Sequence, residues 1–488
     1  MRHSLLATLG FLVLLGNIHA AAPESLINRK PNIILIMTDD QGYGDLACHG
    51  NPILKTPNLD QLHRQSVRFT DFHVSPTCAP TRSALMTGRH EFFNGITHTI
   101  FERERLRLDA TILPQMLKQQ GYRTGIFGKW HLGDEDAYQP QKRGFDEVFI
   151  HGAGGIGQTY AGSCGDAPGN RYFDPVIRKN GQFVKTSGYC TDVFFDEMIR
   201  WVDSQRKQGP FFAYVTPNAP HAPLDCPVGS DEPYRGKVPN PVAKFYGMIA
   251  NIDTNMGKLM AKLREWELET NTLLIFMTDN GTATGSQVFN AGMRGAKGTP
   301  FTGGTRVPAF WRWTGTLPAG VDVPVLTCHW DILPTFVELT GHQPKPEWKA
   351  TWQGRSLVPL LQDPKANWPD RIFISHVGRW KNGEAATGRD VQASIRNARW
   401  QLVIQNPKKI ELFDLKNDPG EQRNVMLEHP EVAAELRAEF NRWWDAVQPN
   451  LVNESAKPPA INPFKEAYWR QFGGPGPNQV PPPPGLLR

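Results

Sequence analysis

The chain has 488 residues, 40% of them hydrophobic, and a formal net charge of +5. This length exceeds what one hydrophobic core usually organises, so a large domain with a smaller one is expected. The positive charge is small for this length and forms no basic block, which argues against a nucleic-acid-binding protein.

Residues 1–22 have the features of an export signal. Arg2 and His3 precede an apolar run over 5–15, and three alanines at 20–22 provide a cleavage site. The run is shorter than the roughly 20 apolar residues that a membrane-spanning helix needs. We therefore expect a cleaved signal, no membrane anchor, and a periplasmic or secreted protein.

Strand-like apolar runs alternate with helix-like segments over the first 360 residues, which predicts an α/β sheet core. The expected strands are 32–37, 124–127, 211–215 and 273–277. The expected helices between them begin at Pro57 and cover 111–121, 191–209 and 242–266.

Polar residues follow each of these strands. They are Asp39 and Asp40, then Lys129 and His131, then His221, and finally Asp279 and Asn280. Open α/β sheets bind ligands outside the carboxyl ends of their strands. We therefore expect these side chains to meet in one crevice.

The acidic members of this set suggest a metal site. Asp39, Asp40, Asp279 and Asn280 offer only oxygen atoms, which suit Ca²⁺ or Mg²⁺ better than Zn²⁺. Taken singly, the first pair also fits a helix cap and the second a tight turn. Their joint position after two predicted strands favours the metal site.

A cysteine motif lies between these two acidic pairs in the sequence. Pro80 can begin a helix, which places Cys78 at a helix N-terminus where a bound sulfate or phosphate would be stabilised. Arg82 follows one turn later, so we expect its guanidinium to hold oxyanion oxygens beside Cys78. A buried structural thiol is the alternative interpretation.

The chain changes character beyond about residue 360. Short strands are expected at 372–376, 391–395, 400–404 and 412–415, followed by a helix over 430–444. This pattern predicts a small antiparallel sheet backed by one helix, and the Pro-rich tail is expected to be an extended strap or disordered. The expected parts are a signal peptide (1–22), a catalytic domain (29–360), a C-terminal subdomain (361–452) and a tail (453–488).

From Pro31 to about Asn424 the chain resembles the type I, formylglycine-dependent sulfatases, which are arylsulfatase-like members of the alkaline phosphatase superfamily. The matching motifs are Cys78-x-Pro80-x-Arg82 with Thr87-Gly88-Arg89, Gly128–Gly133, Pro-His-Ala-Pro around His221, Lys297–Phe301, Gly303–Pro308 and Asp418–Glu421. One position departs from the pattern, because Thr81 stands where the family most often has Ser. The resemblance implies an alkaline-phosphatase-like fold with a four-stranded C-terminal subdomain and the hydrolysis of sulfate esters.

The resemblance also implies roles for individual residues. Cys78 would be oxidised to formylglycine by a formylglycine-generating or sulfatase-maturating enzyme. Ca²⁺, or Mg²⁺ in its place, would be held by Asp39, Asp40, Asp279, Asn280 and the modified Cys78. Arg82 and Lys129 would hold the hydrated aldehyde, His131 would take a proton from it, and His221 and Lys297 would hold sulfate and serve the leaving group.

The expected substrate is a sulfated carbohydrate or an aryl sulfate. Candidate rim residues are His98, Arg103, Arg235, His376 and Arg379. Two alternatives remain open: a phosphodiesterase or phosphonate monoester hydrolase, and a non-catalytic carbohydrate-binding relative in which Cys78 is not oxidised. Among the six cysteines we expect a disulfide between Cys164 and Cys190, which bracket a Gly-rich loop.

Overall fold

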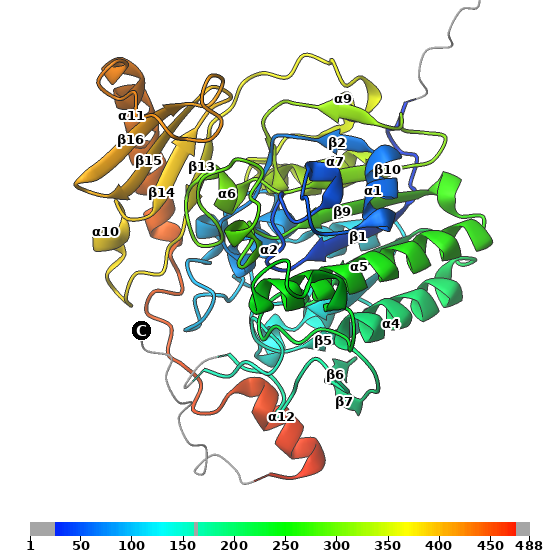
Figure 1. Cartoon of the computed structure of the whole chain (residues 1–488). Coiled ribbons are helices and arrows are strands. Elements are labelled where there is room, and N and C mark those ends of the chain that lie inside the picture. The colour runs from blue at the N-terminus through cyan, green and yellow to red at the C-terminus, as the bar shows by residue number, and fades with distance from the viewer. Residues whose placement is uncertain (1–24, 161–163, 475–488) are drawn as a thin grey trace, which may run out of the picture.

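The computed structural model describes residues 25–160 and 164–474, so the expected signal peptide lies outside the described residues. A large layered domain built on a ten-stranded sheet stands beside a smaller four-stranded sheet (Figure 1). The expected α/β architecture with a separate antiparallel sheet is confirmed. In the described part of the chain no helix is both long and apolar enough to cross a bilayer.

The centre of the large sheet is parallel and contains all four expected strands. β1 pairs with β9 on one side and β8 on the other, and β4 and β5 continue the parallel run beyond β8. Their bounds are β1 Asn32–Thr38, β4 Arg123–Lys129, β5 Glu147–His151, β8 Phe211–Thr216 and β9 Thr272–Thr278.

Antiparallel pairings at both sides make the sheet mixed. β10 runs antiparallel to β9 and β2, and β5, β6 and β7 form an antiparallel ladder at the other edge. The outer strands are β2 Val67–Phe69, β6 Val176–Lys179, β7 Gln182–Lys185, β10 Ala309–Arg312 and β11 Val321–Val323; β3 Phe72–His73 and β12 Thr327–Cys328 pair separately.

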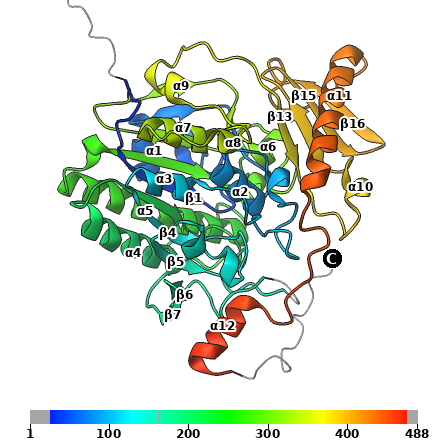
Figure 2. The same ribbon diagram turned by 180° about the vertical axis from the view of Figure 1, so that it is seen from behind.

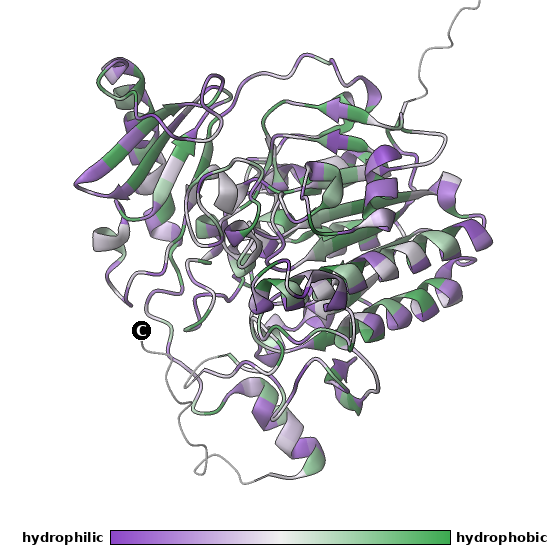
Figure 3. Cartoon of the chain, in the orientation of Figure 1, coloured by the Kyte–Doolittle hydropathy of each residue, from purple (hydrophilic) through white to green (hydrophobic). Residues whose placement is uncertain are grey.

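Helices cover both faces of this sheet. Ile33 and Leu35 of β1 belong to one hydrophobic cluster and Ile34 and Ile36 to another, as expected for a strand buried on two sides. α1 Pro57–Arg64, α4 Cys190–Gln205 and α5 Asn240–Glu265 cover one face, and α2 Cys78–Thr87, α3 Leu113–Gln119, α7 Ile332–Thr340 and α9 Val358–Gln362 cover the other (Figure 2). The strands β1, β8 and β9 are mostly hydrophobic, whereas the helices alternate hydrophobic and polar sides (Figure 3).

The four-stranded sheet follows the predicted order in the chain. β13 Phe373–His376, β14 Ala393–Arg396, β15 Trp400–Asn406 and β16 Lys409–Asp414 form an antiparallel meander, and α11 Pro430–Val447 packs on it. Phe440 and Trp444 of α11 are buried in this second core. Short helices α6 Thr302–Thr305, α8 Pro346–Lys349 and α10 Ala385–Gly388 complete the connections.

The tail differs from the expectation, because α12 covers Pro463–Phe472. Asn462 caps this helix by accepting hydrogen bonds from the main-chain N–H groups of Phe464 and Lys465. Phe464 is 1% exposed and packs against Phe183 of β7 with a ring separation of 5.7 Å. The high proline content of the whole tail therefore gave no indication of this helix. The run of prolines at 481–484 lies outside the described residues.

Candidate active site

Side chains from the carboxyl ends of the central parallel strands converge, as the sequence predicts. Asp39 and Asp40 follow β1, and Asp279 and Asn280 follow β9. The in-register pairing of Thr38 with Thr278 sets these two pairs side by side. The backbone N–H of Asp40 donates to Asp279 Oδ1 at 3.3 Å.

Cys78 begins α2 and lies against this acidic group. Its Sγ is within 4.8 Å of carboxylate oxygens of Asp39 and Asp279, and its exposed fraction is 3%. Thr81 is buried on the same helix and its hydroxyl donates to the carbonyl of Ser75 at 3.1 Å. A threonine is therefore accommodated at this position by a hydrogen bond to the turn before the helix.

The oxygen atoms near Cys78 fit a hard divalent cation. Asp39 Oδ1 and Asn280 Oδ1 are buried and have no hydrogen-bond partner among the described residues. Asn280 Nδ2 donates to Asp40 Oδ1 at 3.0 Å, which directs its own Oδ1 away from that carboxylate. An unsatisfied buried oxygen typically costs about 1–3 kcal/mol, and a cation bound at these oxygens would remove that cost.

Each carboxylate of the site has a cationic partner. Lys129 Nζ lies 2.7 Å from Asp39 Oδ2, Lys297 Nζ lies 2.7 Å from Asp40 Oδ2, and Arg82 Nη2 lies 2.6 Å from Asp279 Oδ2. Three carboxylates thus face three cations, and the cluster is close to neutral. Adding a divalent cation would make it positive and ready to receive an anion.

Two opposing effects set the pKa values of the carboxylates: burial raises them, and pairing with cations lowers them. Burial raises the pKa of Asp39 despite its contact with Lys129. Burial also acts to raise the pKa of Asp40, but Lys297 and His221 outweigh it and hold that pKa below its usual range. Burial, together with repulsion from Asp39, raises the pKa of Asp279 to about 6. Asp39 and Asp279 are therefore the carboxylates at which a proton competes with a metal ion as the pH falls.

Arg82, which the sequence predicts to lie beside Cys78, is hydrogen-bonded to the acidic group. Its Nε and Nη2 donate to Asp279 Oδ2 at 3.2 and 2.6 Å, and its Nη1 donates to the carbonyl of Lys129 at 3.0 Å. A fully buried guanidinium must find such partners because its charge cannot be solvated. Arg82 therefore holds a candidate metal ligand in place.

His131 presents an open proton acceptor. Its Nε2 lies 2.8 Å from the carbonyl of Thr99, so Nε2 carries the proton and Nδ1 the lone pair. Nδ1 is buried without a partner in the described part of the chain. Burial, reinforced by Lys129, holds the pKa of His131 well below its usual value, so the ring is neutral. A Cβ on Gly154 would lie 2.6 Å from His131 Cε1, so only glycine allows the ring this position.

His221 lies close to Asp40. Its Nδ1 donates to the carbonyl of Ala222 at 2.6 Å, and its Nε2 lies 3.8 Å from Asp40 Oδ2. Burial lowers the pKa of His221 to about 4, although Asp40 acts in the other direction. The hydroxyl of Tyr172 donates to the His221 carbonyl at 2.6 Å and fixes this segment.

The structure separates the expected rim residues into buried and accessible ones. Arg103 is 1% exposed and pairs with Glu454 at 3.2 Å, and His376 is 0% exposed beneath Trp444, so neither lies on a rim. Arg235 forms a surface ion pair with Asp231. Arg103 and His376 thus serve internal packing. Their residue types are also typical of a binding rim, so the sequence alone does not distinguish a buried residue from a rim residue.

Two of the rim residues remain beside the site. His98 is partly exposed, and Arg379 is exposed with its Nη2 3.3 Å from Thr99 Oγ1. Thr99 also supplies the carbonyl that fixes His131. Tyr160, which the sequence did not single out, lies near Cys78, Lys297 and Arg379, and burial raises the pKa of its hydroxyl. Its Gly-rich surroundings at 152–158 have no regular periodicity, so nothing in the sequence distinguished it.

The expected disulfide is absent. All six cysteines lie in the described part of the chain and none is joined to another, so Cys164 and Cys190 carry thiols. Cys190 is fully buried at the start of α4, where it packs as a small apolar side chain.

Comparison with known proteins agrees with this geometry. Residues 31–342 match the family described as Sulfatase, and residues 298–445 match the family described as N-sulphoglucosamine sulphohydrolase, C-terminal. Arylsulfatase A of Homo sapiens is 31% identical over 454 residues, covering 83% of this chain and 85% of that protein. N-acetylgalactosamine-6-sulfatase of Homo sapiens is 32% identical over 431 residues, covering 81% of each.

A solved structure shares the whole architecture. Ps i-CgsB superposes with a TM-score of 0.78 at 28% identity, covering 91% of this chain and 98% of that chain. A second structure of Ps i-CgsB is a complex with k-i-k-neocarrahexaose.

Proposed function

Because the chain belongs to the sulfatase family and is a sulfuric ester hydrolase, we propose that it desulfates a carbohydrate with a nucleophile made from Cys78. The observation that carries this proposal is the position of Cys78. It begins a helix, lies within 4.8 Å of Asp39 and Asp279, and borders two buried oxygen atoms without partners among the described residues. Family membership favours sulfate esters over the phosphodiester and phosphonate alternatives.

We propose that Asp39, Asp40, Asp279, Asn280 and the modified residue 78 hold Ca²⁺, with Mg²⁺ as the second choice. When bound, the cation polarises the sulfuryl oxygens, and the hydrated aldehyde at position 78 supplies a nucleophilic hydroxyl. Lys129 and Lys297, each within 2.7 Å of a carboxylate of this group, add positive charge where the ester binds.

The two histidines have different parts in this proposal. His131 accepts a proton at Nδ1, because the carbonyl of Thr99 keeps the other proton on Nε2. His221 gives a proton from Nε2 to the departing alcohol. That nitrogen is unprotonated in the free site, where burial lowers the pKa of His221 to about 4, so the bound anionic ester must favour its protonation.

A sulfated carbohydrate is proposed as the substrate because of the named relatives and the accessible rim. One relative is an N-acetylgalactosamine-6-sulfatase, and Ps i-CgsB binds a neocarrahexaose. Arg379 and His98 lie at the entrance beside Thr99, where a second sulfate or a sugar hydroxyl would meet them. A periplasmic or secreted location, with residues 1–22 as the signal, suits such a substrate.

The proposal also requires a modifying enzyme. Cys78 is 3% exposed in the folded chain, so a formylglycine-generating or sulfatase-maturating enzyme must reach it before folding is complete. The proposed catalytic domain is 29–360, the C-terminal subdomain 361–452 and the tail 453–488.

One experiment tests the nucleophile and the reaction together. The mass of the tryptic peptide 69–82 reports whether Cys78 is an aldehyde, and sulfate release from defined sulfated oligosaccharides reports the activity. We expect the aldehyde in active protein and no turnover by Cys78→Ala, whereas Cys226→Ala retains it. Full turnover by protein that carries only the thiol would overturn the proposal and favour a different nucleophile.

A further inference from the structure

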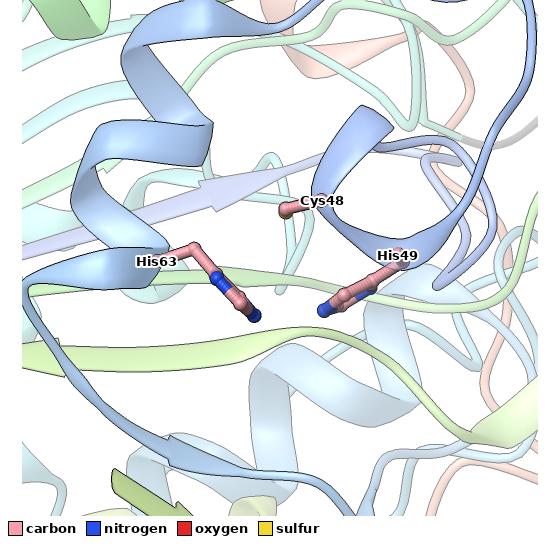
Figure 4. A group of neighbouring side chains, drawn as sticks. All are labelled: Cys48, His49 and His63. Atoms are coloured by element: carbon pink, nitrogen blue, oxygen red, sulfur yellow. The ribbon is translucent and has the colours of Figure 1, made fainter. Parts of the chain in front are cut away.

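A second group of metal-ligand side chains lies near the loop that carries Asp39 and Asp40. Cys48 and His49 belong to the 3₁₀ turn Ala47–His49, and His63 belongs to the last turn of α1. One ligand atom of each lies within 4.8 Å of those of the other two. Figure 4 shows a nitrogen at the end of each histidine ring directed toward the other ring, across the space below Cys48. All three residues are partly exposed.

His49 is oriented as metal-bound histidines usually are. Its Nδ1 lies 2.8 Å from the carbonyl of Tyr43, so Nδ1 donates and Nε2 keeps its lone pair. The ring of Tyr43 stacks on the imidazole at a centroid distance of 3.8 Å, and Arg306 lies 4.2 Å above Tyr43. These contacts fix the direction of the free nitrogen before any ion binds.

The surroundings of His63 allow it to become a ligand. Arg68 Nη1 lies 3.4 Å from His63 Nδ1, which is a weak contact. The guanidinium is held more firmly by Asp322 at 2.6 Å and by the carbonyl of Gly320 at 2.9 Å. Moving the His63 proton from Nε2 to Nδ1 frees Nε2 for a metal ion. It also requires Arg68 Nη1 to turn away, because both nitrogens would then be donors.

The thiol of Cys48 is protonated until a cation displaces its proton. Burial, with the nearby Asp60 carboxylate, raises the pKa of Cys48 above its ordinary value. A thiol in that state is a poor nucleophile and is slow to oxidise. Metal coordination is the interaction that favours its thiolate, and the displaced proton passes to solvent.

We propose that Cys48, His49 and His63 form a second metal site, which binds Zn²⁺ or another borderline-soft divalent cation. Two imidazoles and one thiolate are the preferred ligands of such ions, in contrast to the oxygen atoms at the catalytic centre. Tetrahedral Zn²⁺ with bonds of 2.0–2.3 Å needs ligand atoms about 3.5 Å apart, which small side-chain rotations within the 4.8 Å group provide. A bound ion would join the loop after β1 to α1.

The test is a Co²⁺ titration of full-length protein without a polyhistidine tag, in excess Ca²⁺. We expect a thiolate-to-cobalt charge-transfer band that saturates at one ion per chain and disappears when Zn²⁺ is added. Cys48→Ser should abolish the band, and Cys226→Ser, which removes the other partly exposed thiol, should retain it. His63→Gln should weaken Co²⁺ binding by at least about tenfold.

Two controls accompany the titration. Each variant is first shown by circular dichroism and thermal unfolding in chelator to be folded like the wild type. The titration is repeated with Cys78→Ala, in which the band should persist, because Cys78 is the cysteine of the other candidate metal group. Absence of the band in wild-type protein, its persistence in Cys48→Ser, or its loss in Cys78→Ala alone would each overturn the proposed site.

Discussion

Two groups of candidate metal ligands follow the same strand, β1, and differ in almost every physical respect. Asp39 and Asp40 are fully enclosed, and each carboxylate of their group is paired with a lysine or arginine. Cys48 and His49 are partly exposed and neutral, and among the described residues neither forms an ion pair, although Asp60, Arg68 and Arg306 lie nearby. Buried charges must be balanced, whereas neutral ligands near the surface can stand empty at little cost. Substitutions should therefore lower stability and activity strongly in the first group and weakly in the second.

The largest expected effect is that of Asp279→Ala. The substitution removes a candidate metal ligand and leaves Arg82 buried without its carboxylate, so sulfate release should be lost and the free energy of unfolding should fall by about 3–5 kcal/mol. The measurement is urea unfolding in chelator together with sulfate release in Ca²⁺. Glu428→Ala, which breaks the exposed ion pair with Arg423, should cost no more than about 1 kcal/mol. Equal losses for the two variants would show that burial does not set the cost of breaking an ion pair in this protein.

His221→Ala should have the next largest effect, and its size should depend on the leaving group. A sugar alkoxide needs a proton and a nitrophenolate does not, so desulfation of the sugar should slow by about 10²–10⁴ and that of the aryl sulfate far less. Single-turnover measurements isolate the step concerned. If both substrates slow equally, His221 binds sulfate only and the proton donor must be another group, with Lys297 the first to test.

The pH dependence of metal affinity should separate the two groups. Burial raises the pKa of Asp279 to about 6, so the metal-free folded protein holds a proton there below that pH. Ca²⁺ affinity should be flat above about pH 6 and fall below it. Zn²⁺ must displace the Cys48 proton, whose pKa is raised, so its affinity should rise about tenfold per pH unit through the neutral range. Calorimetric titrations between pH 5 and 8 measure both, and parallel profiles would contradict the distinction.

The smallest expected effect is that of Cys48→Ser on catalysis. With Ca²⁺ in excess, sulfate release should stay within about twofold of wild type, because Cys48 lies outside the group of proposed catalytic residues. The rise in thermal midpoint caused by Zn²⁺ in wild-type protein should be absent in this variant. A large loss of activity would show that the loop after β1 transmits the change to Asp39 and Asp40.

The sequence was informative where function depends on the ends of strands. Asp39 and Asp279 were expected to meet because parallel strands end at one edge of a sheet, and they do. The sequence did not identify Asp279 as the partner of Arg82, because the partner of a buried charge, in this case 197 residues away, is set by the tertiary fold. Arginine and histidine are common on a binding rim, but Arg103 and His376 are buried. Only the packing of the folded chain distinguishes a buried residue of these types from one on a rim.

The packing of α12 against the large domain is a late step in folding, because this helix is near the end of the chain. Phe464 packs on β7 and lies against Gly152, at the start of the loop that brings Gly154 to His131. The surroundings of His131 are therefore complete only after almost the whole chain has been made. At about 5–20 residues per second, the roughly 390 residues from Cys78 to Phe464 take on the order of 20–80 s to synthesise. Over that interval the proposed modification of Cys78 competes with folding, and the distance in sequence between the nucleophile and the final helix sets how long the modifying enzyme has to act.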